Sequence, residues 1–170
     1  MMNDNKKRTI VVLFTCYKDM ISDFVYYISG KSYTHASVAL EENSDVFYSF
    51  NKKGFRKEYP KRYKKKMRNQ SVAIYLEVSE KSWLQLQHQL MEMEAASERY
   101  HYSTLGVLTC LLHIAWRRKG RYFCSQFVSE LLGLTDEIQL KKKSSLYLPC
   151  QLAKELSELS CVKHIKLQPV

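Results

Sequence analysis

A cysteine stands directly before a short amphipathic segment in this chain. Cys124 precedes SQFVSELLG, in which the apolar residues recur at helical spacing (Phe127, Val128, Leu131 and Leu132). At the start of a helix, unpaired backbone N–H groups and the positive end of the helix dipole favour a thiolate. The same N–H groups can stabilise an oxyanion on a substrate carbonyl. The pattern predicts a nucleophile at a helix N-terminus, and the alternative is a small buried hydrophobe.

The predicted helix over 124–132 also has a polar side and a natural end. Its other face carries Ser125, Gln126, Ser129 and Glu130. Gly133 follows, and glycine commonly ends helices.

A thiolate needs a base, and His35 is the best placed of the five histidines. It opens a predicted strand over 34–40, in which alternate residues share a face: His35, Ser37 and Ala39 on one, and Ala36, Val38 and Leu40 on the other. From the edge of a sheet such a side chain can reach a facing helix start. The alternative is an ordinary strand histidine, and the remaining four suit exposed or packing roles (His88, His101, His113 and His164).

The two segments together resemble a known family. The pairing of YTHASVAL (33–40) with YFCSQFV (122–128) is similar to the circularly permuted papain-fold cysteine amidases, which are related to NlpC-type cell-wall peptidases and include the YiiX-like proteins. In that group the histidine strand precedes the cysteine helix, as here, where the two residues are 89 positions apart (124 minus 35). The resemblance extends from the Ile10 strand to about Pro149 and implies an α+β, permuted papain-like fold with a central antiparallel sheet packed by helices.

The resemblance also implies roles for single residues. Cys124 matches the nucleophile and His35 the general base. The family orients its histidine with a polar residue, often glutamate, on the following strand, where this chain has Ser49, with Asn51 as the alternative. A serine can hydrogen-bond to an imidazole but cannot stabilise an imidazolium as a carboxylate does. A tyrosine near the oxyanion is typical of the relatives, and Tyr102 is the first candidate here and Tyr17 the second.

The implied activity is hydrolysis of an amide, peptide or acyl ester bond through an acyl-enzyme on Cys124. No cofactor or metal is expected for it. An alternative within the same fold is a lipid acyltransferase or phospholipase-like enzyme, since the relatives include lipid-modifying members.

A dense basic segment supports a third, non-enzymatic reading. The net charge of the chain is +10, and residues 52–68 contribute +9 of it, from ten Lys and Arg against the single acid Glu58. Such a segment attracts anionic membranes or polymers. Substrate or anion contacts are therefore expected from Lys52, Lys53, Arg56, Lys57, Lys61 and Arg62. Tyr59 and Tyr63 could stack on bases, but no recognised nucleic-acid motif frames them, so nucleic acid is a disfavoured partner.

Composition sets the class of the protein. With 170 residues, 45% of them hydrophobic and only 5 Gly and 3 Pro, the chain predicts a single domain with an irregular basic excursion at 52–68. Five cysteines without C-x-x-C spacing indicate reduced thiols. The apolar stretches 10–16 and 104–116 are too short to span a bilayer as helices. These features predict a soluble, cytoplasmic protein.

Several segments must position the two reactive residues. Buried or alternating strands are predicted over 9–15, 34–40, 46–50, 72–78 and 161–167. Helices are predicted over 19–29, over 79–99 with Ser79 as its cap, over 124–132 and over 149–159, while 104–116 is a helix or a buried apolar segment. The mixture, with its hairpin, predicts the α+β class.

Overall fold

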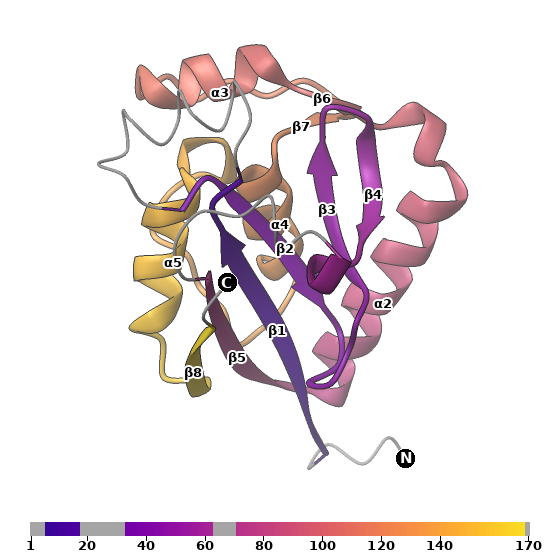
Figure 1. Cartoon of the computed structure of the whole chain (residues 1–170), viewed down its shortest axis with the longest axis vertical. Helices are drawn as coiled ribbons and strands as arrows, with labels where there is room; N and C mark the ends of the chain where they lie inside the picture. The colour runs from indigo at the N-terminus through magenta and orange to yellow at the C-terminus, as the bar shows by residue number, and fades with distance from the viewer. Residues whose placement is uncertain (1–5, 18–32, 63–70, 169–170) are drawn as a thin grey trace.

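The computed structural model describes residues 6–17, 33–62 and 71–168. Its centre is a six-stranded antiparallel sheet in the order β4-β3-β2-β1-β5-β8 (Figure 1). The strands are β1 Lys7–Thr15, β2 His35–Ala39, β3 Phe47–Asn51, β4 Gly54–Glu58, β5 Ser71–Ser79 and β8 Val162–Gln168. A separate two-stranded parallel ladder joins β6 His101–Tyr102 to β7 Arg121–Tyr122.

Four α-helices complete the described part of the chain: α2 Glu80–Ala95, α3 Thr104–Leu111, α4 Cys124–Leu132 and α5 Pro149–Ser157. Single 3-10 turns lie at Pro60–Arg62, Ser97–Arg99 and Ser144–Leu146. The α+β class is thereby confirmed. The helix predicted over 19–29 lies outside the described residues. No helix in the described ranges has the length and apolarity needed to cross a membrane.

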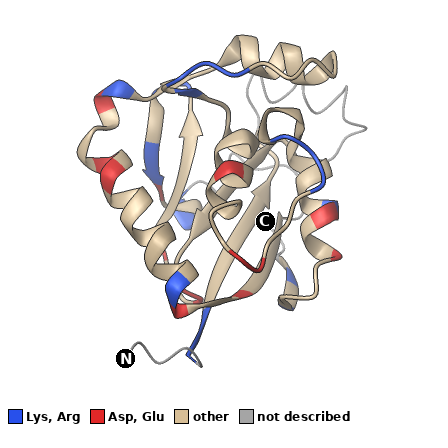
Figure 2. Cartoon of the chain, turned by 180° about the vertical axis from the view of Figure 1, so that it is seen from behind, with Lys and Arg blue, Asp and Glu red and all other residues tan. Residues whose placement is uncertain are grey.

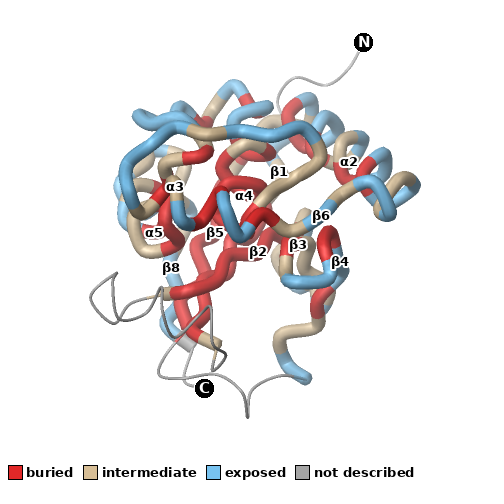
Figure 3. Tube along the Cα trace, turned by 90° about the horizontal axis from the view of Figure 1, so that it is seen from above, coloured by how far each residue is buried: buried red, intermediate tan, exposed pale blue. Residues whose placement is uncertain are grey.

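The core forms because alternate residues of the central strands point to opposite faces. Ile10, Val12 and Phe14 of β1 join one large cluster with residues of α2, α4 and α5. Val11 and Leu13 join a smaller cluster on the other face with residues of β2 and β5. Figure 3 shows α4 and the central strands as the most buried part of the molecule. Strand β1 therefore separates two apolar layers.

Helix α2 follows the sequence pattern closely. The Ser79 hydroxyl accepts a hydrogen bond from the Ser82 backbone N–H, as an N-cap should. The apolar stripe of Trp83, Leu86, Leu90 and Met93 is buried as predicted. The helix ends at Ala95, one turn before the expected end, because the chain tightens into the 3-10 turn Ser97–Arg99.

Helix α4 has the predicted bounds, and Ser125, Gln126 and Ser129 of its polar side are buried as well. Ser125 donates a hydrogen bond of 2.6 Å to the carbonyl of Tyr147, and Ser129 donates to the carbonyls of Gln126 and Ser144. The segment leading into α5 packs over this side of the helix. The helix that carries the cysteine is therefore held from two sides.

The prediction of an irregular basic excursion is also wrong for its first half. Residues 54–58 form β4, which pairs with β3 along its whole length. Phe55 anchors this strand in the core against Phe50 and Phe127, although four of the other nine residues from 52 to 61 are lysines. One buried aromatic side chain and the hairpin turn are sufficient to define the strand. Residues 63–68 of the basic segment lie outside the described part.

The turn between β3 and β4 depends on a glycine. Gly54 has a φ of +86°, a conformation that side chains strongly disfavour, and a Cβ there would lie 2.2 Å from the backbone oxygen of Tyr100. Asn51 stabilises the same turn by accepting a hydrogen bond from the Lys53 backbone N–H. The hairpin is thus fixed both by its own backbone and by contact with the chain that follows α2.

Replacing Gly54 by Ala is therefore expected to destabilise the protein by about 2 kcal/mol or more, because strain and a backbone clash combine. The free energy of unfolding in urea measures this. Gly133→Ala is the matched control, since Gly133 has an ordinary helical conformation and room for a methyl group. Equal effects of the two substitutions would contradict the assignment.

Candidate active site

The two residues singled out by the sequence come together at one end of the sheet. His35 is the first residue of β2 and Cys124 the first of α4. The Cys124 thiol donates a long hydrogen bond, 4.0 Å, to the carbonyl of Thr34, the neighbour of His35. Both side chains lie just beneath the surface, since Cys124 is 5% and His35 7% exposed. Only a small fraction of either reactive side chain is therefore exposed.

The approach of α4 to β2 follows from packing. Phe127 and Val128 on the first turns of the helix belong to the same core cluster as Ala36 and Phe50 on the two strands beneath. Phe123, which precedes the helix in an extended conformation, is buried in a second cluster with Val107. The start of α4 is thus fixed on both sides, and with it the position of the sulfur.

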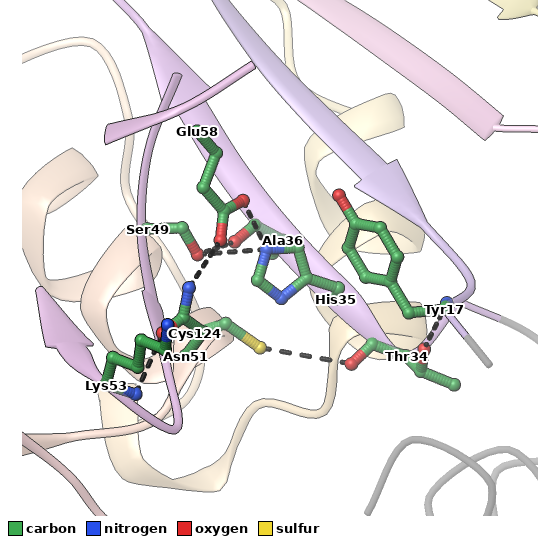
Figure 4. A network of polar contacts seen from close by, with 9 residues as sticks. All are labelled: Tyr17, Thr34, His35, Ala36, Ser49, Asn51, Lys53, Glu58 and Cys124. Carbon is green, nitrogen blue, oxygen red and sulfur yellow. Dashed lines mark hydrogen bonds and ion pairs between the residues drawn. The ribbon is translucent and has the colours of Figure 1, made fainter. Parts of the chain in front are cut away.

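His35 is held by two groups on neighbouring strands. Its Nε2 lies 2.8 Å from Glu58 Oε2 and 3.1 Å from Ser49 Oγ (Figure 4). The Ser49 hydroxyl donates its hydrogen to the carbonyl of Ala36, at 2.8 Å, so it can only accept from the imidazole. This network assigns a hydrogen to Nε2. In Figure 4 the other ring nitrogen, Nδ1, is on the side of the ring where the sulfur lies.

The electrostatics of the pair are those of a buried ion pair. Burial opposes the charged imidazole, but the Glu58 charge and hydrogen bonds with Cys124 and Glu58 outweigh it and hold the pKa of His35 well above 6.5. Burial likewise opposes the charged carboxylate, yet the charge of His35 and hydrogen bonds from His35 and Asn51 lower the pKa of Glu58. Both shifts favour an imidazolium beside a carboxylate.

Glu58 is the residue that sequence reasoning missed. The sequence marks it only as the single acid of the basic segment, and it favours Ser49, with Asn51 as the alternative, as the residue that orients His35. Ser49 does lie on Nε2, but Asn51 donates to Glu58 Oε1 at 3.3 Å and so contacts the carboxylate instead of the imidazole. A lone acid among ten cations, one strand beyond the expected position, was the available signal.

Of the two candidate tyrosines, Tyr17 is the one whose ring contacts His35. The ring centroids are 5.1 Å apart and meet edge to face. The Tyr17 backbone N–H donates to the Thr34 hydroxyl, which places it at the same end of the sheet. Tyr102, the preferred candidate, lies in β6, paired with Tyr122, and packs against the Val107 cluster.

The six expected cations divide into two groups. Lys57 pairs with Glu94 on α2, Lys61 pairs with Asp45, and Arg62 lies over the ring of Tyr59. Lys52 and Lys53 are in the exposed hairpin turn, and Arg56 is exposed on β4. Figure 2 shows cations spread over several elements of the molecule. In its described part, residues 52–62, the basic segment is therefore not one continuous surface of unpaired cations.

Among the described residues, no group of three or more His, Cys, Asp and Glu side chains is placed to hold a metal ion. All five cysteines are free thiols. Comparison of the chain with protein-family models, curated proteins and solved structures found no match.

The pair makes a testable contribution to stability. Because the pKa of His35 is raised and that of Glu58 lowered, the stabilisation is complete between the unfolded-state values of about 4.5 and 6.5. It is lost as pH rises through the raised pKa of His35 or falls through the lowered pKa of Glu58. Glu58→Gln is expected to cost about 2 kcal/mol in this window, with a smaller difference at higher pH.

Urea unfolding from pH 4 to pH 10 measures that difference, and NMR titration of the His35 ring tests its cause. The pKa of His35 should fall in Glu58→Gln, while exposed His88 serves as the internal control. An unchanged His35 titration would show that the carboxylate is not its partner in solution.

Proposed function

We propose that the protein is a cysteine hydrolase of amide, peptide or acyl ester bonds, with the fold of the permuted papain-like amidases. The observation that carries the proposal is the series Cys124, His35 and Glu58, in which a buried carboxylate holds the far nitrogen of a histidine beside a thiol at a helix start. Placement of the histidine strand before the cysteine helix and the packing of α4 on an antiparallel sheet support the fold assignment.

In the proposed mechanism the Cys124 thiolate attacks the substrate carbonyl carbon, and a C–S bond forms. The backbone N–H of Cys124 stabilises the oxyanion, with Tyr17 the better placed of the two tyrosines to assist. His35 donates its proton to the leaving amine or alcohol as the C–N or C–O bond breaks. Water then attacks the thioester, His35 accepts its proton, and the C–S bond breaks to release the acid. Glu58 stabilises the imidazolium whenever His35 carries the second proton, as Ser49 alone would not.

The assignment of the nucleophile is tested by alkylation of the folded protein with limiting iodoacetamide at pH 6, with each thiol followed by mass spectrometry. Cys124 should react about tenfold or more faster than the other thiols. Burial raises the pKa of Cys110 to about 11 and also raises that of Cys161, so both should stay unreactive. His35→Ala should remove the advantage of Cys124.

Cys124→Ala should abolish turnover of any substrate that the wild type cleaves, with the free energy of unfolding little changed. Half-buried Cys150 is the matched control, and Cys150→Ala should keep full activity. Activity that survives in Cys124→Ala would overturn the proposal, and so would alkylation of Cys124 no faster than that of Cys150.

A second candidate, acyl transfer on lipids, is favoured by one surface. Helix α3 exposes a row of apolar side chains that continues beyond its end (Leu105, Leu108, Leu112 and Ile114). The exposed cations Arg117, Arg118 and Lys119 follow directly in the chain, and Arg117 pairs with Glu130 of α4. Apolar side chains beside cations are typical of anionic membrane surfaces. Val107 on the buried side of α3 packs with Phe123, so this surface adjoins the cysteine helix.

The lipid surface is tested by sedimentation with vesicles of phosphatidylglycerol and phosphatidylcholine. The double variant Leu108→Ser, Leu112→Ser should bind at least about tenfold more weakly, since two large apolar side chains no longer enter the membrane. Met91→Ser is the control, because Met91 is as exposed but lies on α2. Equal binding by wild type and double variant would remove the support for a lipid substrate.

The third reading, a polymer-binding module, is weakened by the partners of Lys57, Lys61 and Arg62.

A further inference from the structure

We propose that Arg56 forms an anion-binding subsite beside the Cys124–His35 centre, so that the substrate carries a carboxylate or phosphate close to the acyl group that is cleaved. The inference rests on the proposed function and names the class of substrate for it. Arg56 is a specificity residue in this scheme and takes no part in the bond-breaking steps.

The position of Arg56 follows from the register of the hairpin. Its Cα lies directly opposite that of Ser49, so the two side chains project from the same face of the sheet. Ser49 Oγ is 3.1 Å from the imidazole of His35. Two residues further along β4, Glu58 projects from this same face and reaches His35. Arg56 therefore lies beside Ser49, the residue that His35 contacts together with Glu58.

Its neighbours on β4 face the other way. Phe55 enters the main core, and Lys57 reaches Glu94 on α2, which covers the opposite face of the sheet. Further along the chain, Lys61 pairs with Asp45 and Arg62 lies over the ring of Tyr59. By contrast, no hydrogen bond, ion pair or ring contact engages Arg56 among the described residues. Within the part of the chain that the structure describes, Arg56 is thus an exposed and unpaired guanidinium on the face that carries the reactive histidine.

The net charge of the Cys124, His35 and Glu58 side chains favours a cation such as Arg56 nearby. A thiolate, an imidazolium and a carboxylate sum to −1, and all three groups are buried with little water to screen them. Such a centre repels an anionic substrate. Arg56 restores neutrality and offers planar paired donors, which suit carboxylate and phosphate oxygens.

Two alkylating reagents of nearly equal size test the electrostatic potential at the Cys124 sulfur, and no known substrate is needed. Iodoacetate is an anion and iodoacetamide is neutral, and with both the thiolate displaces iodide as a C–S bond forms. The measured quantity is the ratio of their rate constants at Cys124, which cancels changes in thiolate content. Arg56→Gln should lower the iodoacetate-to-iodoacetamide ratio about threefold or more.

Lys57→Gln is the matched control, because it removes the same charge from the adjacent residue of the same strand on the opposite face. Its ratio should stay near that of the wild type. If both variants lower the ratio equally, the effect is one of net charge and the subsite is wrong. If Cys124 reacts slowly with both reagents in the wild type, the proposed function fails. If Cys124 reacts fast but Arg56→Gln leaves the iodoacetate-to-iodoacetamide ratio unchanged, only the subsite is rejected.

The chemistry of the anion is distinguished by competition. Sodium phosphate and sodium acetate at matched ionic strength are each tested as inhibitors of iodoacetate at Cys124. Stronger inhibition by phosphate indicates a phosphorylated substrate, and stronger inhibition by acetate a carboxylate. The inhibition should disappear in Arg56→Gln. If neither anion slows the wild-type reaction more than sodium chloride does, Arg56 does not form a binding subsite.

Discussion

A carboxylate removed from water needs a cation in contact with it, and this requirement organises one end of the molecule. Glu58 is only 8% exposed, and His35 supplies the opposite charge. The two residues are on β4 and β2, so their contact crosses β3 and passes over Ser49. The ion pair therefore depends on the register of three strands, and the turn at Gly54 helps to set that register.

The sulfur is positioned by a different kind of interaction. Helix α4 is held against β2 and β3 by apolar side chains, and the segment before α5 hydrogen-bonds to its polar side. Polar contacts thus fix the base, while packing fixes the nucleophile. The two systems share the core cluster around Phe50 and Phe127, where the hairpin and the helix meet. A change in that cluster would move both reactive groups.

The sequence was informative where structure is determined locally. Ser79 and its apolar stripe define α2, and the spacing of Phe127 to Leu132 defines α4, because capping and helical periodicity need only neighbouring residues. Strand β4 was hidden because Phe55 is its only apolar side chain among charged neighbours. Glu58 was missed for a related reason: its partner is 23 residues away, and the contact exists only once the hairpin is folded onto β2. The order of His35 and Cys124 could be seen in the sequence, whereas the third member of the series required the strand register.

Strand β4 has one further consequence, which comes from its place at the border of the described sheet. An edge strand presents backbone donors and acceptors that a second chain can use, and this is a common start of aggregation. Arg56 and Lys57 are exposed on this edge, and Lys52 and Lys53 stand at its turn. Two such edges would bring like charges together, so the cations discourage copies of the protein from joining strand to strand. The same short strand thus supplies the buried acid and the cations that protect its own edge.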